Sequence, residues 1–164
     1  MTNLDNEIKR RITYTDHLVD KLNEIKNIAI TCYITGKRDP QKRKVRLYRK
    51  SNDYNYIKPW YDTVKEKDIY GIIFHDKCSD SFVKKYQTDK IFFVKCKMGP
   101  YSINDERFIV YANFLSKFKF DFVVATDVSD VEFNKNPFDF IQEKDKIYRS
   151  EEHTSELQSQ FRIS

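Results

Sequence analysis

Four short apolar runs, separated by polar and helix-like segments, set the strongest limit on how this chain can fold. Each run is rich in Ile, Val or Phe and ends at polar or turn-forming residues, which is typical of a buried strand. Strands that alternate with helices at this spacing favour right-handed crossovers. We therefore predict an α/β fold with a mostly parallel sheet and flanking helices. The runs occupy residues 28–34, 69–74, 91–94 and 120–126.

Three segments have the apolar spacing of amphipathic helices. The first covers about 5–26, and we treat residues 1–26 as an N-terminal element. The second begins at Ser79 or the residue after it and the third at 102–105, because residues of these types cap helix N-termini. We expect the Asn- and Tyr-rich segment 51–61 to be irregular and 45–48 to be a brief edge strand.

The composition excludes several classes of protein. The chain of 164 residues fits one domain, and its 40% hydrophobic and 15% aromatic residues suffice for a packed core. No apolar stretch approaches the roughly 18 residues of a membrane span, and the N-terminus lacks the apolar region of a signal peptide. Because Cys32, Cys78 and Cys96 are widely spaced, buried free thiols are favoured over a disulfide framework or a zinc site. We expect a cytoplasmic protein.

The last part of the chain differs from the rest in composition. Residues 149–159 read RSEEHTSELQS, which contains no Lys and no Tyr. This peptide is identical to the translation of a common sequencing-library adapter. We therefore predict that residues 149–164 are an adapter-derived, non-native tail, and that the natural protein continues differently after Tyr148. His153 is excluded from any site for this reason.

Two carboxylates, Asp127 and Asp130, directly follow the last predicted strand. In open α/β sheets, ligands collect outside the carboxyl ends of the strands. A carboxylate pair at that edge can share one divalent cation, which often takes one or two carboxylates together with substrate phosphates. The D-x-x-D spacing alone equally allows a simpler role, in which Asp127 ends the strand and Ser129 or Asp130 caps the next turn.

The sequence NDERF at 104–108, followed by FDFVVATDVSDVEFNKNPF at 120–138, resembles nucleotide-sugar-dependent glycosyltransferases of the GT-A fold. In some of these proteins a helix with a similar basic and aromatic sequence precedes a strand that ends in T-D-x-x-D-V-x-F. The order of predicted strands over 28–138 also looks like the N-terminal, nucleotide-binding half of that fold. The resemblance covers about two thirds of the chain, while its specific motif occupies only 104–138.

The resemblance implies roles for particular residues. Asp127 and Asp130 match the acidic motif that holds Mn²⁺ or Mg²⁺ and the donor diphosphate, and Arg107 matches a basic residue that faces the donor. Ser129 would orient one of the carboxylates. Many of these enzymes carry D-x-D, so the resemblance leaves open which carboxylate binds the cation directly. Donor contacts after the first strand would fall on Thr35, Gly36 and Lys37.

The expected function is therefore that of a metal-dependent glycosyltransferase fragment, which would transfer a sugar from a UDP- or GDP-sugar to an unknown acceptor. Residues 27–148 would form an incomplete nucleotide-sugar-binding domain. No catalytic base is assigned, because in such enzymes it usually lies after the acidic motif. We expect the chain to bind donor but to be inactive in turnover, and to be marginally stable because later strands would be missing.

Two other functions remain open at this point. The basic segment 37–50, interleaved with Tyr48, is the pattern of a nucleic-acid-binding surface, although the net charge is only +5 and no binding motif accompanies it. Such a run also steers anionic ligands. A nucleotidyltransferase on a related sheet is a further alternative.

Simpler roles also remain for several residues near these motifs. We expect Arg107 to be a solvated helix residue that pairs with an acidic neighbour, if it does not bind donor. His75 would be a hydrogen-bonded residue at a strand end, and Tyr101 and Tyr111 would pack. The dipeptide at 137–138 would anchor the loop after the acidic motif.

Overall fold

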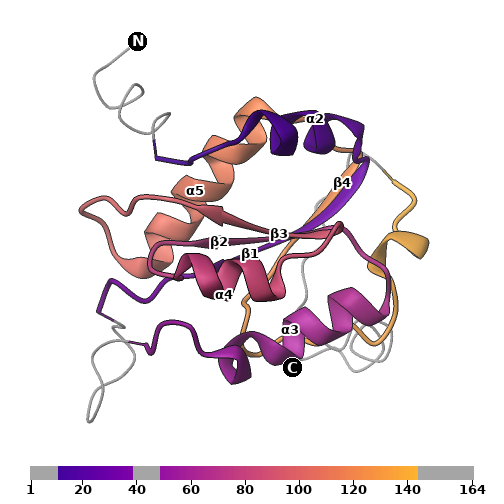
Figure 1. The fold of residues 1–164 in the computed structure, drawn as a ribbon. Coiled ribbons are helices and arrows are strands. Elements are labelled where there is room, and N and C mark those ends of the chain that lie inside the picture. Colours follow the sequence, from indigo (N-terminus) through magenta and orange to yellow (C-terminus); the bar gives the residue numbers. More distant parts are fainter. Residues whose placement is uncertain (1–10, 39–48, 144–164) are drawn as a thin grey trace.

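The computed structural model describes residues 11–38 and 49–143. Within them, four strands form one sheet in the order β3-β2-β1-β4, and every neighbouring pair is parallel (Figure 1). The predicted α/β architecture with a parallel sheet is therefore confirmed, and each strand lies within or beside its predicted run. The strands are β1 (Asn27–Tyr33), β2 (Gly71–His75), β3 (Ile91–Lys95) and β4 (Phe122–Ala125).

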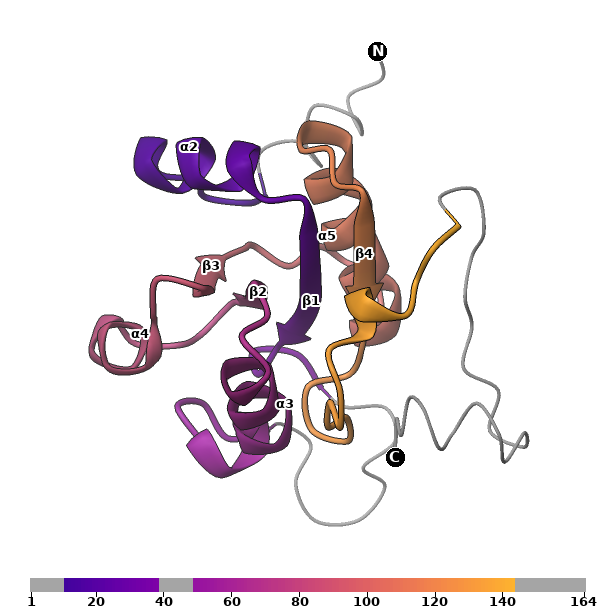
Figure 2. The same ribbon diagram turned by 90° about the vertical axis from the view of Figure 1, so that its right-hand side faces the viewer.

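Helices cover both faces of this sheet. Figures 1 and 2 show α2 and α5 over one face and α3 and α4 over the other. Side chains alternate along a strand, so β1 sends Ile28 and Ile30 to the first face and Ala29 and Tyr33 to the second, and each face has its own apolar core. The helices are α2 (Asp16–Glu24), α3 (Tyr54–Glu66), α4 (Asp80–Tyr86), α5 (Ile103–Lys117) and the short 3₁₀ helix η1 (Pro137–Asp139).

Capping residues start two of these helices where the sequence predicts. The Ser79 hydroxyl accepts a hydrogen bond from the Phe82 amide at 3.2 Å, and the Ser102 hydroxyl accepts one from the Asp105 amide at 3.2 Å. These bonds satisfy amides that have no partner inside the helix. Both predicted helix starts are confirmed, and α5 matters most because it carries Arg107.

The predicted helix over about 5–26 is confirmed for α2, Asp16–Glu24, and is wrong for residues 11–15. Residues 11–13 run antiparallel to β3: the Thr13 amide donates to the Lys95 carbonyl at 2.9 Å and the Lys97 amide donates to the Arg11 carbonyl at 2.7 Å. The helix begins only after Thr15, whose hydroxyl caps it. The apolar stripe is nevertheless real, because Ile12 and Leu22 enter the same core.

The expectation of irregular structure at 51–61 is also wrong, since α3 begins at Tyr54. Asp53 caps it by accepting a hydrogen bond from the Asn55 amide at 3.1 Å. Its buried face comes from residues at helical spacing, and Trp60 is fully buried. That indole ring lies against β2, where a Cβ added to Gly71 would be 2.7 Å from a ring carbon, so only glycine allows α3 this close to the sheet.

The strand order contains one reversal of direction. From β1 the chain moves outward to β2 and β3, then returns through α5 to place β4 on the other side of β1, as Figure 2 shows. Such a switch point leaves a crevice outside the carboxyl ends of the two strands that flank it. In this protein the crevice must lie beyond the ends of β1 and β4.

Some sequence predictions lie outside the described residues. These are the edge strand at 45–48, most of the basic segment 37–50, and the adapter-like tail at 149–164. In the described part of the chain, no helix has the length and apolar character needed to cross a bilayer.

Candidate functional site

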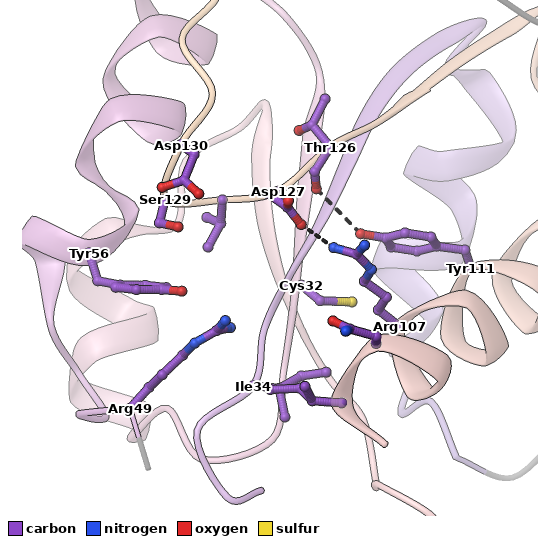
Figure 3. A pocket seen from close by; sticks show the side chains of 13 residues that line it. Cys32, Ile34, Arg49, Tyr56, Arg107, Tyr111, Thr126, Asp127, Ser129 and Asp130 are labelled. Carbon is purple, nitrogen blue, oxygen red and sulfur yellow. Dashed lines mark hydrogen bonds and ion pairs between the residues drawn. The ribbon is translucent and has the colours of Figure 1, made fainter. Parts of the chain in front are cut away.

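A cleft of about 150 Å³ lies at the switch point between the ends of β1 and β4. Cys32 lies in β1 and Ile34 directly follows this strand. Both lie between the two walls of the cleft (Figure 3). Arg107 and Tyr111 of α5 form one wall, and Arg49 and Tyr56 form the other. The loop after β4 closes the cleft with Asp127, Ser129 and Asp130.

The loop after β4 buries two valines and presents polar side chains to the cleft. Val128 and Val131 are 2% and 3% exposed and pack in the core beneath α3. Burial of these two valines turns the residues between and before them outward. Asp127, Ser129 and Asp130 therefore all line the cleft.

The Asp127 carboxylate already has a partner inside the cleft. Arg107 Nη1 donates to Asp127 Oδ1, with the two side chains 30% and 55% exposed. The Nε atom of Arg107 is buried and has no hydrogen-bond partner among the described residues. Figure 3 shows Asp127 turned toward Arg107, whereas Asp130 lies beside Ser129 on the side of Tyr56.

The opposite wall consists of Arg49, which belongs to the basic segment 37–50, and Tyr56, which the sequence does not single out. The Tyr56 ring stacks on Tyr33 with centroids 5.4 Å apart, and the Arg49 guanidinium carbon lies 5.2 Å from the Tyr56 centroid. The Tyr33 hydroxyl donates to the Lys50 carbonyl at 2.5 Å and accepts from the Asp53 amide at 3.0 Å. Burial raises the pKa of Tyr33 to about 12, so its hydroxyl keeps its proton.

The floor of the cleft is rigidly held and chemically inert. Thr126 receives a hydrogen bond from the Thr31 hydroxyl on its carbonyl at 2.8 Å and one from the Trp60 indole on its own hydroxyl at 2.9 Å. Burial raises the pKa of the Cys32 thiol to about 12, so it stays protonated near neutral pH. Cys32 is thus a lining residue and not an activated nucleophile.

The structure does not place the three predicted residues after β1 in the cleft. The amides of Thr35 and Gly36 donate to the two carboxylate oxygens of Asp76, each at 2.9 Å. Lys37 donates to the Tyr101 carbonyl, and its Nζ lies 3.7 Å from Glu106 Oε1. None of these three residues is among those that line the cleft.

Glu106 anchors this side of the molecule. Its carboxylate is fully buried, and it accepts hydrogen bonds from Arg11 Nη1 at 2.8 Å and from the Tyr101 amide at 3.0 Å. The Arg11 guanidinium lies directly over Gly99, where an added Cβ would be 2.3 Å from a guanidinium nitrogen. This network ties residues 11–13 and the loop before α5 to the start of that helix.

The other residues near the motifs are placed as follows. Tyr111 is buried and packs as expected, but Tyr101 is 43% exposed, so the expectation that it packs is wrong. His75 is 3% exposed and burial lowers its pKa to about 4, yet its Nδ1 has no partner among the described residues, so it packs without being fully hydrogen-bonded. Pro137 is buried and anchors the loop as expected.

The chemistry of the cleft allows a divalent cation. Among residues 11–38 and 49–143, no three His, Cys, Asp or Glu side chains come together as a metal site. Two carboxylates nonetheless suit a hard cation such as Mg²⁺ when substrate phosphates supply the remaining oxygen ligands. Asp127 and Asp130 would hold the cation, and Arg49 and Arg107 would face the phosphates.

Comparisons of the chain with protein-family models, with curated proteins and with solved structures find no match. The interpretation of the cleft therefore rests on its position in the fold and on its residues.

Proposed function

We propose that the cleft binds the diphosphate of a nucleotide-sugar together with Mn²⁺ or Mg²⁺, and that this domain is the donor-binding part of a glycosyltransferase of GT-A type. The observation that carries the proposal is the meeting of Asp127, Asp130 and Arg107 in one cleft at the switch point of the sheet. That position is where open α/β sheets bind their ligands.

Each charged residue of the cleft has a role in this proposal. Asp127 and Asp130 hold the cation, and Ser129 orients one of these carboxylates. Arg107 and Arg49 contact the diphosphate from opposite walls of the cleft. When bound, the cation neutralises charge that develops on the departing diphosphate and positions it for transfer of the sugar.

The size of the cleft supports binding of only part of the donor inside it. About 150 Å³ is the volume of a cavity that holds one benzene ring. Sites that enclose a whole drug-sized ligand are about 300–1,000 Å³. The diphosphate and cation would therefore lie within the cleft, and the base and sugar would extend along its rim.

Titration calorimetry of the full chain with UDP and GDP, with and without Mn²⁺ or Mg²⁺, tests this function. We expect binding that requires the cation, and at least a tenfold loss in Asp130→Asn, because a ligand of the cation becomes uncharged. Glu132→Gln is the matched control, since Glu132 is an exposed carboxylate of the same loop outside the cleft. Equal, cation-independent binding by both variants would remove the basis of the proposal.

The two alternatives predict different results in the same experiments. A nucleotidyltransferase would also bind nucleotide with a cation, and product analysis separates it from a glycosyltransferase. A nucleic-acid-binding module would show salt-sensitive binding of RNA or DNA that Asp130→Asn leaves unchanged. The two carboxylates in the cleft favour a cation-dependent nucleotide site over a nucleic-acid-binding surface. We favour a glycosyltransferase over a nucleotidyltransferase because of the resemblance of residues 104–138.

A further inference from the structure

The two charges that the proposed ligands need, Arg107 and Asp127, are bound to each other across the cleft. We infer that Arg107 is an exchangeable partner of Asp127: it holds this carboxylate in the free protein and transfers to the diphosphate when the cation arrives. The cation and the diphosphate would then each bind better in the presence of the other. This inference rests on the proposed function and adds a mechanism of regulation to it.

The ion pair leaves part of the guanidinium unsatisfied. Only Nη1 of Arg107 contacts Asp127, and Nε is buried with no partner among the described residues. A buried donor without a hydrogen bond has lost its contacts with water and destabilises the protein. A phosphate can accept two parallel hydrogen bonds from an arginine, so exchange would satisfy the nitrogen that is now orphaned.

The ion pair also holds one carboxylate away from the other. Asp127 is turned toward Arg107, while Asp130 lies near Ser129 on the far side of the loop (Figure 3). In the described part of the chain, Asp130 forms no ion pair. A cation that enters alone therefore meets one available carboxylate and one that a guanidinium has neutralised.

The same reasoning applies to the anion. A diphosphate that enters alone meets an Arg107 whose charge Asp127 has neutralised. When both ligands arrive, the Arg107–Asp127 ion pair is replaced by two interactions: Asp127 binds the cation, and Arg107 binds the diphosphate. Because both side chains are partly exposed, neither exchange requires repacking of the core. Coupling between two ligands is reciprocal, so each must raise the affinity of the other by the same factor.

The test measures Mn²⁺ binding by the electron paramagnetic resonance signal of free Mn²⁺, for the full chain with and without UDP, GDP or inorganic pyrophosphate. Arg107→Met keeps the apolar stem and removes the charge. We expect this variant to bind Mn²⁺ alone about tenfold more tightly than wild type, because Asp127 is released, and to bind diphosphate more weakly. The increase of Mn²⁺ affinity by diphosphate should fall severalfold.

Arg49→Met is the matched control, because it removes the other arginine of the cleft without touching the ion pair. It should weaken diphosphate binding, and its Mn²⁺ affinity should rise much less than that of Arg107→Met. Equal Mn²⁺ affinity in the two variants would overturn the exchange, even if wild type binds nucleotide with Mn²⁺. Failure of wild type to bind any of the three diphosphates would instead overturn the proposed function. Circular dichroism confirms that each variant is folded.

Discussion

The two sides of the β1 strand end differ in a way that explains where a ligand can bind. On the β2 side, the amides of Thr35 and Gly36 donate to the Asp76 carboxylate, which follows β2. On the β4 side, Asp127 and Asp130 line a cleft of about 150 Å³. On the β2 side the backbone amides are hydrogen-bonded within the protein. On the β4 side carboxylate and guanidinium groups line an open cleft.

The direction of the chain accounts for this difference. From β1 to β2 to β3 the chain moves one way across the sheet, so successive loops pack against one another. Between β1 and β4 the direction reverses, and the connecting helices α3 and α5 lie on opposite faces. The loops at this point diverge, which leaves the cleft. The backbone amides near β1 are consumed by the protein itself, so an anionic ligand depends on arginine side chains instead.

The largest expected effect comes from comparing the buried ion pair of Glu106 with the ion pair of the cleft. Arg11→Met removes the guanidinium that contacts the fully buried Glu106 carboxylate and leaves only Lys37 Nζ, 3.7 Å away, as its cation. We expect a loss of about 3–5 kcal/mol in unfolding free energy. Arg107→Met removes the partly exposed pair of the cleft, and we expect a loss below about 1 kcal/mol. Urea denaturation measures both. Equal losses would mean that the Arg107–Asp127 ion pair is shielded from solvent as well as the Arg11–Glu106 ion pair is.

A second effect concerns pH on the closed side. Burial lowers the pKa of His75, at the end of β2, from 6.5 to about 4, with Lys95 lowering it further and Asp76 and Asp80 opposing the shift. The unfolded chain therefore binds this proton more tightly, and stability present above pH 6.5 is lost as the pH falls toward 4. We expect up to about 3 kcal/mol from this group.

Denaturation of wild type and of His75→Phe between pH 7 and pH 4 measures this contribution. The variant removes the titrating group and should lose less stability over the same interval. A parallel decline in both proteins would show that His75 is not the group responsible.

The smallest effect concerns the internal acceptor of the two amides. Asp76→Ala leaves the buried Thr35 amide without a partner, and we expect a loss of about 2 kcal/mol in unfolding free energy. Gly36→Ala should also destabilise, because its Cβ would lie 2.6 Å from Asp76 Oδ2. Asp89→Asn, an exposed carboxylate beyond α4, is the control and should change stability by less than about 0.5 kcal/mol. The proposed nucleotide binding should persist in Asp76→Ala and Gly36→Ala, because neither residue lines the cleft.

The strands could be predicted from sequence because burial on both faces requires continuous apolar runs, which stand out against a polar chain. The sequence does not predict α3, although Ile57, Trp60, Tyr61 and Val64 have helical spacing, because its polar, Asn- and Tyr-rich composition indicates a loop. Pro59 removes one hydrogen bond from this helix, and its buried face packs on the sheet nonetheless. The N-terminal helix was predicted too long, since the spacing of Ile12 fits a strand bridge as well as a helix.

Placement of the candidate site was only partly predictable. Asp127 and Asp130 lie in one short loop, so their shared cleft followed from the end of the strand before them. Arg49 and Tyr56 are far from this loop in sequence, and only the packing of α3 brings them opposite Arg107. The Asp76 contact with Thr35 spans 41 residues and has no local signal.

The close packing of Trp60 on Gly71 determines the position of one wall of the cleft. One helical turn before Trp60 stands Tyr56, so the depth at which the indole settles onto β2 fixes how far the tyrosine stands from the acidic loop. The width of the cleft therefore depends on a residue outside it, because Gly71 has no side chain to push Trp60 and α3 away from the sheet. A larger side chain at position 71 would push α3 away from the sheet and widen the cleft, although residue 71 itself does not line it.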